Sequence, residues 1–294
     1  MRYRVQHTTR YAYGTPVELA AHMVHLRPRP QQWQTVLSER IIADPLPARR
    51  RDGVDHFGNY VTWLFMDMPH ADFEVTSESV VEVDRPPPPY AATTPAWEDV
   101  VQAANTTEGW KAVEFRFPTP MAPLDPAARA YVSTSFSEGR PVLDALLDLN
   151  NRFYSEFRFR SGVTTISTPV SQVMDRKEGV CQDFSHAMIA GLRGIGIAAR
   201  YTSGYIRTKP PPGQVKRQGA DQSHAWVGAW LGPEHGWIDV DPTNGIVIKD
   251  EHVLLGWGRD FSDVSPVRGV ILGGGDHVVT VGVDLEPLED EEAA

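Results

Sequence analysis

Cysteine is almost absent from this chain, with Cys181 the only one in 294 residues. A single cysteine cannot close an internal disulfide, and it cannot form a cluster of thiolate ligands around a metal ion. No apolar run approaches the roughly 18 residues of a membrane-spanning helix, and the first residues lack the apolar core of a signal peptide. We therefore expect a cytoplasmic protein without a membrane segment.

Basic residues are also scarce. The chain has 28 Lys and Arg against 38 Asp and Glu, so its formal net charge at pH 7 is -10. A nucleic-acid-binding surface needs clustered Lys and Arg that contact phosphates, and anionic lipids repel an acidic surface. The composition therefore argues against a nucleic acid or a membrane as partner, while the length suits two domains or one large one.

The beginning of the chain alternates between apolar and polar side chains, as strands with one buried face do. Strands are expected over residues 3–8, 37–42, 59–65 and 71–84. Several short strands separated by turns indicate an all-β, sandwich-like domain over residues 1–85.

Four consecutive prolines, 86–89, then interrupt all regular structure. Prolines lack the backbone donor and favour a stiff, extended spacer, so we expect a linker near residues 85–95. An ordered, proline-rich edge strand is the alternative. The boundary assigns residues 86–294 to a second domain.

The second domain begins with helical periodicity. Helices are expected over residues 141–156, from the Thr168-Pro169 pair to a stop at Gly179, and over 181–195. Strands are expected over residues 200–206, 224–231, 237–241 and 277–285. Helices and strands in separate blocks predict an α+β domain, and the acidic tail 286–294 is expected to be a frayed, solvated end.

Cys181 opens the third of these helices. It shares a stripe with apolar residues, and a cysteine on such a stripe is, by itself, more often inert core than nucleophile. Its place in the first turn favours the other interpretation, because free N–H groups and the helix dipole stabilise a thiolate and could hold an oxyanion. His186 lies five positions further on and ~140° around the helix, so we expect it to be a packing or surface residue.

A histidine and two aspartates follow on strands joined by a hairpin-like connection. His224 shares one strand face with Trp226 and Trp230, and Trp237 shares another with Asp239 and Asp241. If the hairpin brings the two tryptophan-rich faces together, Asp241 is a direct or diagonal neighbour of His224. Asp241 is therefore the predicted orienter of the imidazole, and Asp239 is the reserve.

Each of these residues also has an ordinary structural explanation, such as a histidine beside an aromatic cluster or a turn-capping aspartate before Pro242. Their occurrence together is what predicts a Cys181–His224–Asp241 site for thiol acyl transfer.

Four segments resemble motifs of the bacterial transglutaminase-like superfamily. They are Gly-Val-Cys-Gln-Asp-Phe-Ser-His (179–186), Arg-Tyr-Thr-Ser-Gly-Tyr (200–205), Ser-His-Ala-Trp-Val (223–227) and Gly-Trp-Ile-Asp-Val-Asp-Pro-Thr (236–243). The likeness extends to residues 55–59 and 258–266. It implies a papain-like core behind an N-terminal β domain, with Cys181 as nucleophile, His224 as general base and Asp241 as third member. Some relatives use an upstream aromatic side chain as second oxyanion donor, but Phe157 and Phe159 in that region cannot donate.

The resemblance implies attack by Cys181 on a peptide, isopeptide or glutamine-type amide, through a thioester. We favour water as the acyl acceptor, which makes the protein a protease or amidase, because nothing marks an amine-binding site. An amine-transferring transglutaminase and a catalytically silent peptide-binding module are the alternatives. No cofactor and no metal are expected, since His22 and His25 lack the spacing of a metal site. Calcium, used by animal relatives, stays open.

Overall fold

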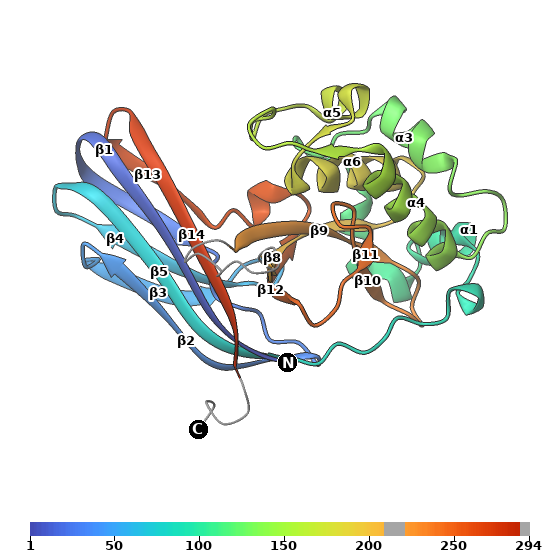
Figure 1. Cartoon of the computed structure of the whole chain (residues 1–294), viewed down its shortest axis with the longest axis horizontal. Helices are drawn as coiled ribbons and strands as arrows, with labels where there is room; N and C mark the ends of the chain where they lie inside the picture. Colours follow the sequence, from blue (N-terminus) through green and yellow to red (C-terminus); the bar gives the residue numbers. More distant parts are fainter. Residues whose placement is uncertain (209–220, 289–294) are drawn as a thin grey trace, which may run out of the picture.

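The computed structural model describes residues 1–208 and 221–288. They form two large antiparallel sheets, a small two-stranded sheet and a group of helices. The first sheet forms one end of the molecule, and the helices gather around the second sheet at the other end (Figure 1). This is the α+β class that the order of the sequence patterns predicts, with an all-β region before the helices. No helix among the described residues is long and apolar enough to cross a membrane.

One long strand organises the first sheet. The first half of β1 (Arg2–Val24) pairs with β5 (His70–Val83) and β14 (His277–Leu288), and its second half pairs with β4 (Tyr60–Met66) and β13 (Val267–Gly273). Its register with β5 shifts between residues 12 and 17, which is also where the other partner strands of β1 change. β1 therefore pairs both with strands from the beginning of the chain, β4 and β5, and with strands from its end, β13 and β14.

Two further strands complete this seven-stranded sheet. β2 (Gln34–Asp44) pairs with β5, and β3 (Arg49–Val54) pairs with β4. Apolar side chains of β1, β2, β4 and β5 form a shared core, of which Phe73 and Leu64 are large buried members. These strands enclose apolar side chains as the alternating pattern requires.

The C-terminal strands correct the predicted domain division. The sequence analysis assigns residues 86–294 to one domain, but β13 and β14 return to the first sheet and pair with β1. The segment 286–288 belongs to β14, so the predicted frayed tail does not begin at Glu286, while residues 289–294 lie outside the described residues. The first sheet is therefore built from both ends of the chain.

The second sheet has the strand order β11-β10-β9-β8-β12, and all its described pairs are antiparallel. Its strands are β8 (Ala199–Ile206), β9 (Gln222–Trp230), β10 (Trp237–Asp241), β11 (Ile246–Val247) and β12 (His252–Gly258). α6 (Cys181–Gly194) packs against β8 and β9, where alternate residues such as Val227 and Ala229 join its core cluster.

The other helices are α1 (Trp97–Ala103), α2 (Trp110–Val113), α3 (Pro126–Ser133), α4 (Val142–Glu156) and α5 (Val170–Arg176), with short 3-10 turns η1 (Ala91–Thr93), η2 (Thr107–Gly109), η3 (Glu114–Arg116) and η4 (Phe261–Asp263). Among these helices, α3 and α5 pack against α6. The apolar stripe of α4 is buried as its periodicity predicts. Two-residue strands β6 (Arg158–Phe159) and β7 (Glu178–Gly179) pair in parallel before α6.

The start and end of α5 differ from the prediction. Thr168 makes no cap, because its hydroxyl accepts a hydrogen bond from the N–H of Thr165 (2.9 Å) and the helix begins after an extended Pro169. The helix ends before Gly179, since Lys177 already adopts a left-handed conformation with φ 52°. Gly179 instead lies in β7 and faces the start of α6.

Two side-chain amides fasten the first sheet to the edge of the second. Gln34 donates to the carbonyl of Leu254 and accepts from its N–H, both at 2.8 Å. Asn59 donates to the carbonyl of Trp257 (2.8 Å) and accepts from its N–H (3.0 Å). Because β12 is an edge strand, these bonds satisfy backbone groups that would otherwise lack partners. The turn at residues 55–59 thus positions the sheet that carries the candidate site.

Candidate active site

Cys181 is the first residue of α6 and follows the extended residue Val180. The side chain of Asp183 turns back to the helix start, where its Oδ2 accepts hydrogen bonds from the N–H of Val180 and the hydroxyl of Thr164, both at 2.7 Å. Gly179 permits this approach, because a Cβ there would lie 2.8 Å from the Cβ of Asp183. The first turn is thereby fixed, and its backbone N–H groups, which have no acceptor within the helix, create positive potential around the thiol.

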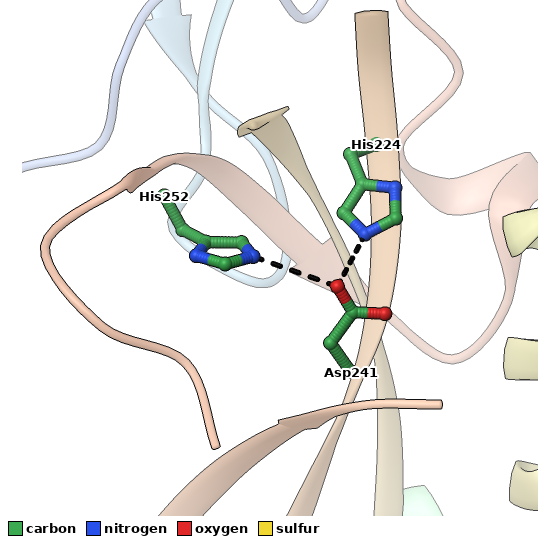
Figure 2. A group of neighbouring side chains, drawn as sticks. All are labelled: His224, Asp241 and His252. Carbon is green, nitrogen blue, oxygen red and sulfur yellow. Dashed lines mark hydrogen bonds and ion pairs between the residues drawn. The ribbon is translucent and has the colours of Figure 1, made fainter. Parts of the chain in front are cut away.

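His224 reaches this thiol from the sheet. It lies near the start of β9, is 7% exposed, and its Nε2 is 2.7 Å from Oδ2 of Asp241 on β10. Figure 2 shows the other ring nitrogen pointing away from Asp241. Burial lowers the pKa of His224, but hydrogen bonds with Asp241 and Cys181, and the charges of both, outweigh it and raise the pKa to about 10. The imidazole is therefore suited to hold a proton beside a thiolate.

Asp241 is completely buried and is held by the turn that follows it. Its Oδ1 accepts hydrogen bonds from the N–H groups of Thr243 (2.9 Å) and Asn244 (3.2 Å), and its Oδ2 accepts one from Nδ2 of Asn244 (2.6 Å). Burial would raise the pKa of this carboxyl, but hydrogen bonds from His224, His252 and Asn244 keep it well below its usual range. The carboxylate is thus charged and fixed before any substrate binds.

The register of the β9–β10 hairpin is the one that the tryptophan pattern predicts. Val240 pairs with Val227, so Asp241 is a diagonal neighbour of His224 on the same face of the sheet. The structure therefore brings together Cys181, His224 and Asp241, three residues that lie up to 60 positions apart in the sequence.

Asp239, the reserve candidate, has other partners. It lies opposite Gly228, and its carboxylate binds Nη1 of Arg85 at 3.1 Å and Nη2 of Arg200 at 3.4 Å. A Cβ at residue 228 would lie 2.6 Å from Nε of Arg200, so glycine there leaves room for this ion pair. Asp239 does not contact the imidazole of His224.

His186 is a packing residue, as its position on α6 predicts. Its Nε2 accepts a hydrogen bond from the N–H of Phe261 (3.2 Å), and its ring centroid lies 5.0 Å from that of Tyr201. Burial lowers the pKa of His186 to about 4, so the ring is neutral and able to accept. The imidazole of His186 is therefore not a candidate base for Cys181.

His252 is the member of the site that the sequence patterns missed. It is buried at the start of β12, and its Nε2 approaches the same Oδ2 of Asp241 at 3.5 Å, beside His224 (Figure 2). Its ring packs edge-on against Trp226, with centroids 5.5 Å apart. Burial lowers its pKa, which favours the neutral imidazole. No sequence spacing could have found it, because its place depends on the pairing of β12 with β8.

His224, Asp241 and His252 are the one group of three side chains among the described residues that could hold a metal ion. The ligand atoms of His224, Asp241 and His252 lie within 4.8 Å of one another, and two imidazoles with a carboxylate suit a transition metal. Binding would require His224 to give up its Nε2 proton and its bond with Asp241. A metal here would therefore compete with the arrangement that orients His224 toward Cys181.

A cavity of about 820 Å³ lies beside the site, between the two sheets. Its lining includes the apolar Val279 and Val281 of β14, Ile166 before α5, and Ser223, the residue before His224. These three apolar side chains are exposed. The first sheet thus supplies part of the lining of this cavity, which Cys181, His224 and Asp241 do not line.

The second oxyanion donor is not an aromatic hydroxyl or indole from residues 157–159. Phe157 is buried in the core, whereas Phe159 is half-exposed and pairs with Gly179, two residues before Cys181. Neither ring has a donor, whereas the N–H of Cys181 and the following N–H groups of α6 have no acceptor within the helix.

A cysteine at a helix start, facing a histidine and an aspartate on an antiparallel sheet, is the geometry of a papain-like α+β protein. A model of the bacterial transglutaminase-like N-terminal region matches residues 3–82, and a model of the transglutaminase-like superfamily matches residues 130–242. An uncharacterised protein of Mycobacterium tuberculosis is 39% identical over 297 residues, covering 99% of this chain and 94% of that protein. The chain belongs to the transglutaminase-like superfamily.

Two further similarities concern proteins with named activities. A protein-glutamine gamma-glutamyltransferase of Pseudomonas aeruginosa is 30% identical over 155 residues, covering 49% of this chain and 23% of that protein. The crystal structure of a candidate cysteine protease from Cytophaga hutchinsonii superposes with a TM-score of 0.76 at 20% identity, covering 98% of this chain and 91% of that one. The second similarity establishes a shared fold across both sheets.

Proposed function

We propose that this protein is a thiol acyl-transfer enzyme that hydrolyses a peptide, isopeptide or glutamine-type amide. Cys181 is the nucleophile, His224 the general base and Asp241 the residue that orients it. The observation that carries this proposal is the 2.7 Å contact between Nε2 of His224 and Oδ2 of the buried Asp241, on a histidine whose pKa is raised by hydrogen bonds with Asp241 and with Cys181. This contact leaves Nδ1 of His224 to exchange a proton with Sγ of Cys181.

Acylation follows from these positions. Nδ1 of His224 takes the thiol proton, and Sγ of Cys181 attacks the amide carbon, whose oxygen becomes an oxyanion. The N–H groups at the start of α6 stabilise this oxyanion. His224 then returns the proton to the departing nitrogen, the C–N bond breaks, and ammonia or an amine leaves behind a thioester.

Deacylation follows the same steps with water in place of the thiol. His224 removes a proton from water, the water oxygen bonds to the carbonyl carbon of the thioester, and the C–S bond breaks. The proton returns to the thiolate of Cys181, and a carboxylic acid leaves. Asp241 stays charged throughout, because its role is to hold the ring and stabilise the imidazolium.

The cavity of about 820 Å³ next to Ser223 supports a polypeptide as substrate. The exposed Val279, Val281 and Ile166 in its lining offer contacts for apolar side chains of such a chain. A peptide or protein amide is therefore the proposed partner, with neither nucleic acid nor membrane involved. A thiol that must remain reduced suits the cytoplasm. Cell fractionation tests that location, and recovery of the protein outside the cytoplasm would contradict it.

Amine transfer is the second candidate, favoured by the similarity to the glutamyltransferase of Pseudomonas aeruginosa. The two activities share acylation and differ in the acceptor that attacks the thioester of Cys181. A lysine-like amine would form an isopeptide bond in place of the carboxylic acid.

The test uses glutamine-containing peptides and peptide amides with the full-length protein. Ammonia or amine release measures acylation, and incorporation of a fluorescent primary amine separates transfer from hydrolysis. We expect release with little incorporation, and no turnover in Cys181→Ala or His224→Ala. Dominant incorporation would favour the transferase. Peptide binding without turnover, unchanged in both variants, would favour the silent binding module.

A further inference from the structure

A second cavity, of about 710 Å³, lies where the first sheet, the linker and the second sheet meet. We call it the arginine cavity, because its walls include Arg29, Arg85 and Arg200. Neither Cys181 nor His224 lines it. Its other lining residues include Trp33, Trp110, Lys111, Trp237, Asp239 and Trp257. Such a concentration of guanidinium groups is unexpected in a chain whose net charge is -10.

The three guanidinium groups stack on tryptophan rings. Arg29 lies 3.6 Å and Arg200 3.9 Å from the ring centroid of Trp257. Arg85 lies 3.5 Å from the ring centroid of Trp33. Stacking uses the flat faces of a guanidinium and leaves its N–H edges free for acceptors in the plane. The tryptophans therefore fix the orientation of the donors.

Negative charge in contact with these groups is limited. Among the described residues, Asp239 is the only carboxylate that forms an ion pair with any of them, and it serves both Arg85 and Arg200. Arg29 donates to two neutral acceptors, the carbonyl of Phe57 and Oδ1 of Asn59. Two other carboxylates, Asp55 and Asp250, influence the arginines from farther away.

Several donors are also unused. Nε and Nη2 of Arg85 and Nε of Arg200 have no hydrogen-bond partner within residues 1–208 and 221–288. The two side chains are only 11% and 8% exposed. Buried guanidinium groups without full pairing are costly, and an anion between them would neutralise charge and accept hydrogen bonds.

We propose that the arginine cavity binds a small molecule or chain terminus through an oxyanion group, a carboxylate or a phosphate. Arg85 and Arg200 hold the oxyanion, and Lys111 adds a positive charge at the rim. Trp110, 65% exposed at the same rim, offers an aromatic surface to the less polar part of the ligand. Glu114 also lies at the rim, but its Oε2 is 2.9 Å from Nε2 of His56. Because this carboxylate has its own partner, it does not compete for the oxyanion site.

The arginine cavity adjoins the candidate active site but does not include its residues. Asp239 and Asp241 lie two positions apart on β10, so their Cα atoms are about 7 Å from each other. Asp239 lines the cavity, whereas Cys181, His224 and Asp241 do not. Binding to the arginine cavity therefore does not require Cys181 to be reactive, and it can be tested without turnover.

The experiment is calorimetric titration of the full-length protein at pH 7 and constant ionic strength, with tryptophan fluorescence as second signal. The probes are citrate and inorganic phosphate, with sodium chloride as the ionic control. We expect saturable binding of at least one probe, about tenfold weaker or more in Arg85→Gln, because a hydrogen bond to a charged group is lost. Asp239→Asn should bind more tightly, since it removes the competing carboxylate. Preference for citrate or for phosphate identifies the oxyanion.

Two further variants keep the test decisive. Arg49→Gln is the matched control, because Arg49 stacks on Phe65 in the first sheet and does not line the cavity. Lys111→Glu changes an exposed rim residue, so it should weaken binding even if Arg85→Gln does not fold. Absence of saturable binding at millimolar concentrations, or equal binding by Arg49→Gln and Lys111→Glu, would overturn the proposal.

Discussion

His224 and Asp241 contact each other diagonally across a β hairpin, with 2.7 Å between Nε2 and Oδ2. The turn after Asp241 donates three more hydrogen bonds to the carboxylate, from Thr243 and Asn244. The imidazole is therefore oriented by a group whose own position depends on the backbone rather than on a bound substrate. Preorganisation of this kind is what a general base needs.

Replacing Asp241 should affect turnover much more than replacing Asp239. Asp241→Asn keeps the shape of the side chain but removes the charge that keeps the pKa of His224 near 10. By analogy with the serine protease triad, we expect kcat/KM to fall by about 10³- to 10⁴-fold. Asp239→Asn should mainly lower the free energy of unfolding, because it leaves Arg85 and Arg200 unpaired.

The measurement is kcat/KM on a peptide amide, corrected for the folded fraction, together with urea unfolding of both variants. A larger loss of turnover in Asp239→Asn than in Asp241→Asn would contradict the assignment of the third catalytic residue.

Cys181 should react with a small haloacetamide at pH values where an ordinary thiol does not. The His224 imidazole, which hydrogen-bonds to Cys181, and the free N–H groups at the start of α6 place a proton acceptor and a positive potential beside the sulfur. We expect rapid alkylation at pH 6 in the natural protein and slow alkylation in His224→Ala. With one cysteine in the chain, the mass gained on labelling reports this residue alone.

The control is His56→Gln, whose exposed imidazole lies away from the site and bonds Glu114. It should alkylate at the natural rate. If His224→Ala reacted as fast as the natural protein at pH 6, the pairing of His224 with Cys181 would not activate the thiol.

His252 should act as a positioning residue through Asp241. The approach of its Nε2 to Oδ2 of Asp241, at 3.5 Å, helps to keep the pKa of Asp241 low, so removal of the imidazole should raise that pKa. We expect His252→Phe to lower kcat several-fold, to leave KM nearly unchanged and to move the acid limb of the pH–rate profile to higher pH. His252→Gln, which can still donate, should recover part of the activity. A changed KM with an unmoved acid limb would indicate that His252 only fills space.

The hairpin of the site could be predicted because its information is local. Alternation in residues 224–231 and 237–241 defines the two faces, and a short connection limits the register, so Asp241 could be chosen over Asp239. The start of α6 at Cys181 could be predicted for the same reason, since caps and periodicity are read over a few residues.

What could not be predicted depends on long-range pairing. The return of β14 to β1 joins residues more than 250 positions apart, and its alternating pattern fits either sheet. The place of His252 depends on the pairing of β12 with β8, and the partners of Asp239 include Arg85 from the linker. No spacing in the sequence encodes these long-range contacts.

Acid should destabilise the protein in part through His7, which lies where the two sheets meet. Its Nδ1 lies 2.9 Å from the hydroxyl of Tyr205 and its Nε2 lies 2.9 Å from that of Thr9. Complete burial lowers its pKa from 6.5 to about 4. Between these pH values the unfolded chain binds a proton that the folded protein does not, so the free energy of unfolding falls as the pH falls, by about 3 kcal/mol in total.

His224 has the opposite sign, because its pKa is raised to about 10 in the folded protein. The part of the free energy of unfolding that His224 contributes is complete below pH 6.5 and is lost only as the pH rises toward 10. It therefore does not change in the pH range in which His7 acts. Urea unfolding between pH 4 and 7 measures the free energy of unfolding at each pH. As the pH falls, this free energy should decrease less steeply in His7→Gln than in the natural protein. The matched control, His277→Gln on the exposed face of β14, should retain the full slope. Equal slopes in all three proteins would mean that His7 is not held neutral at the junction of the sheets.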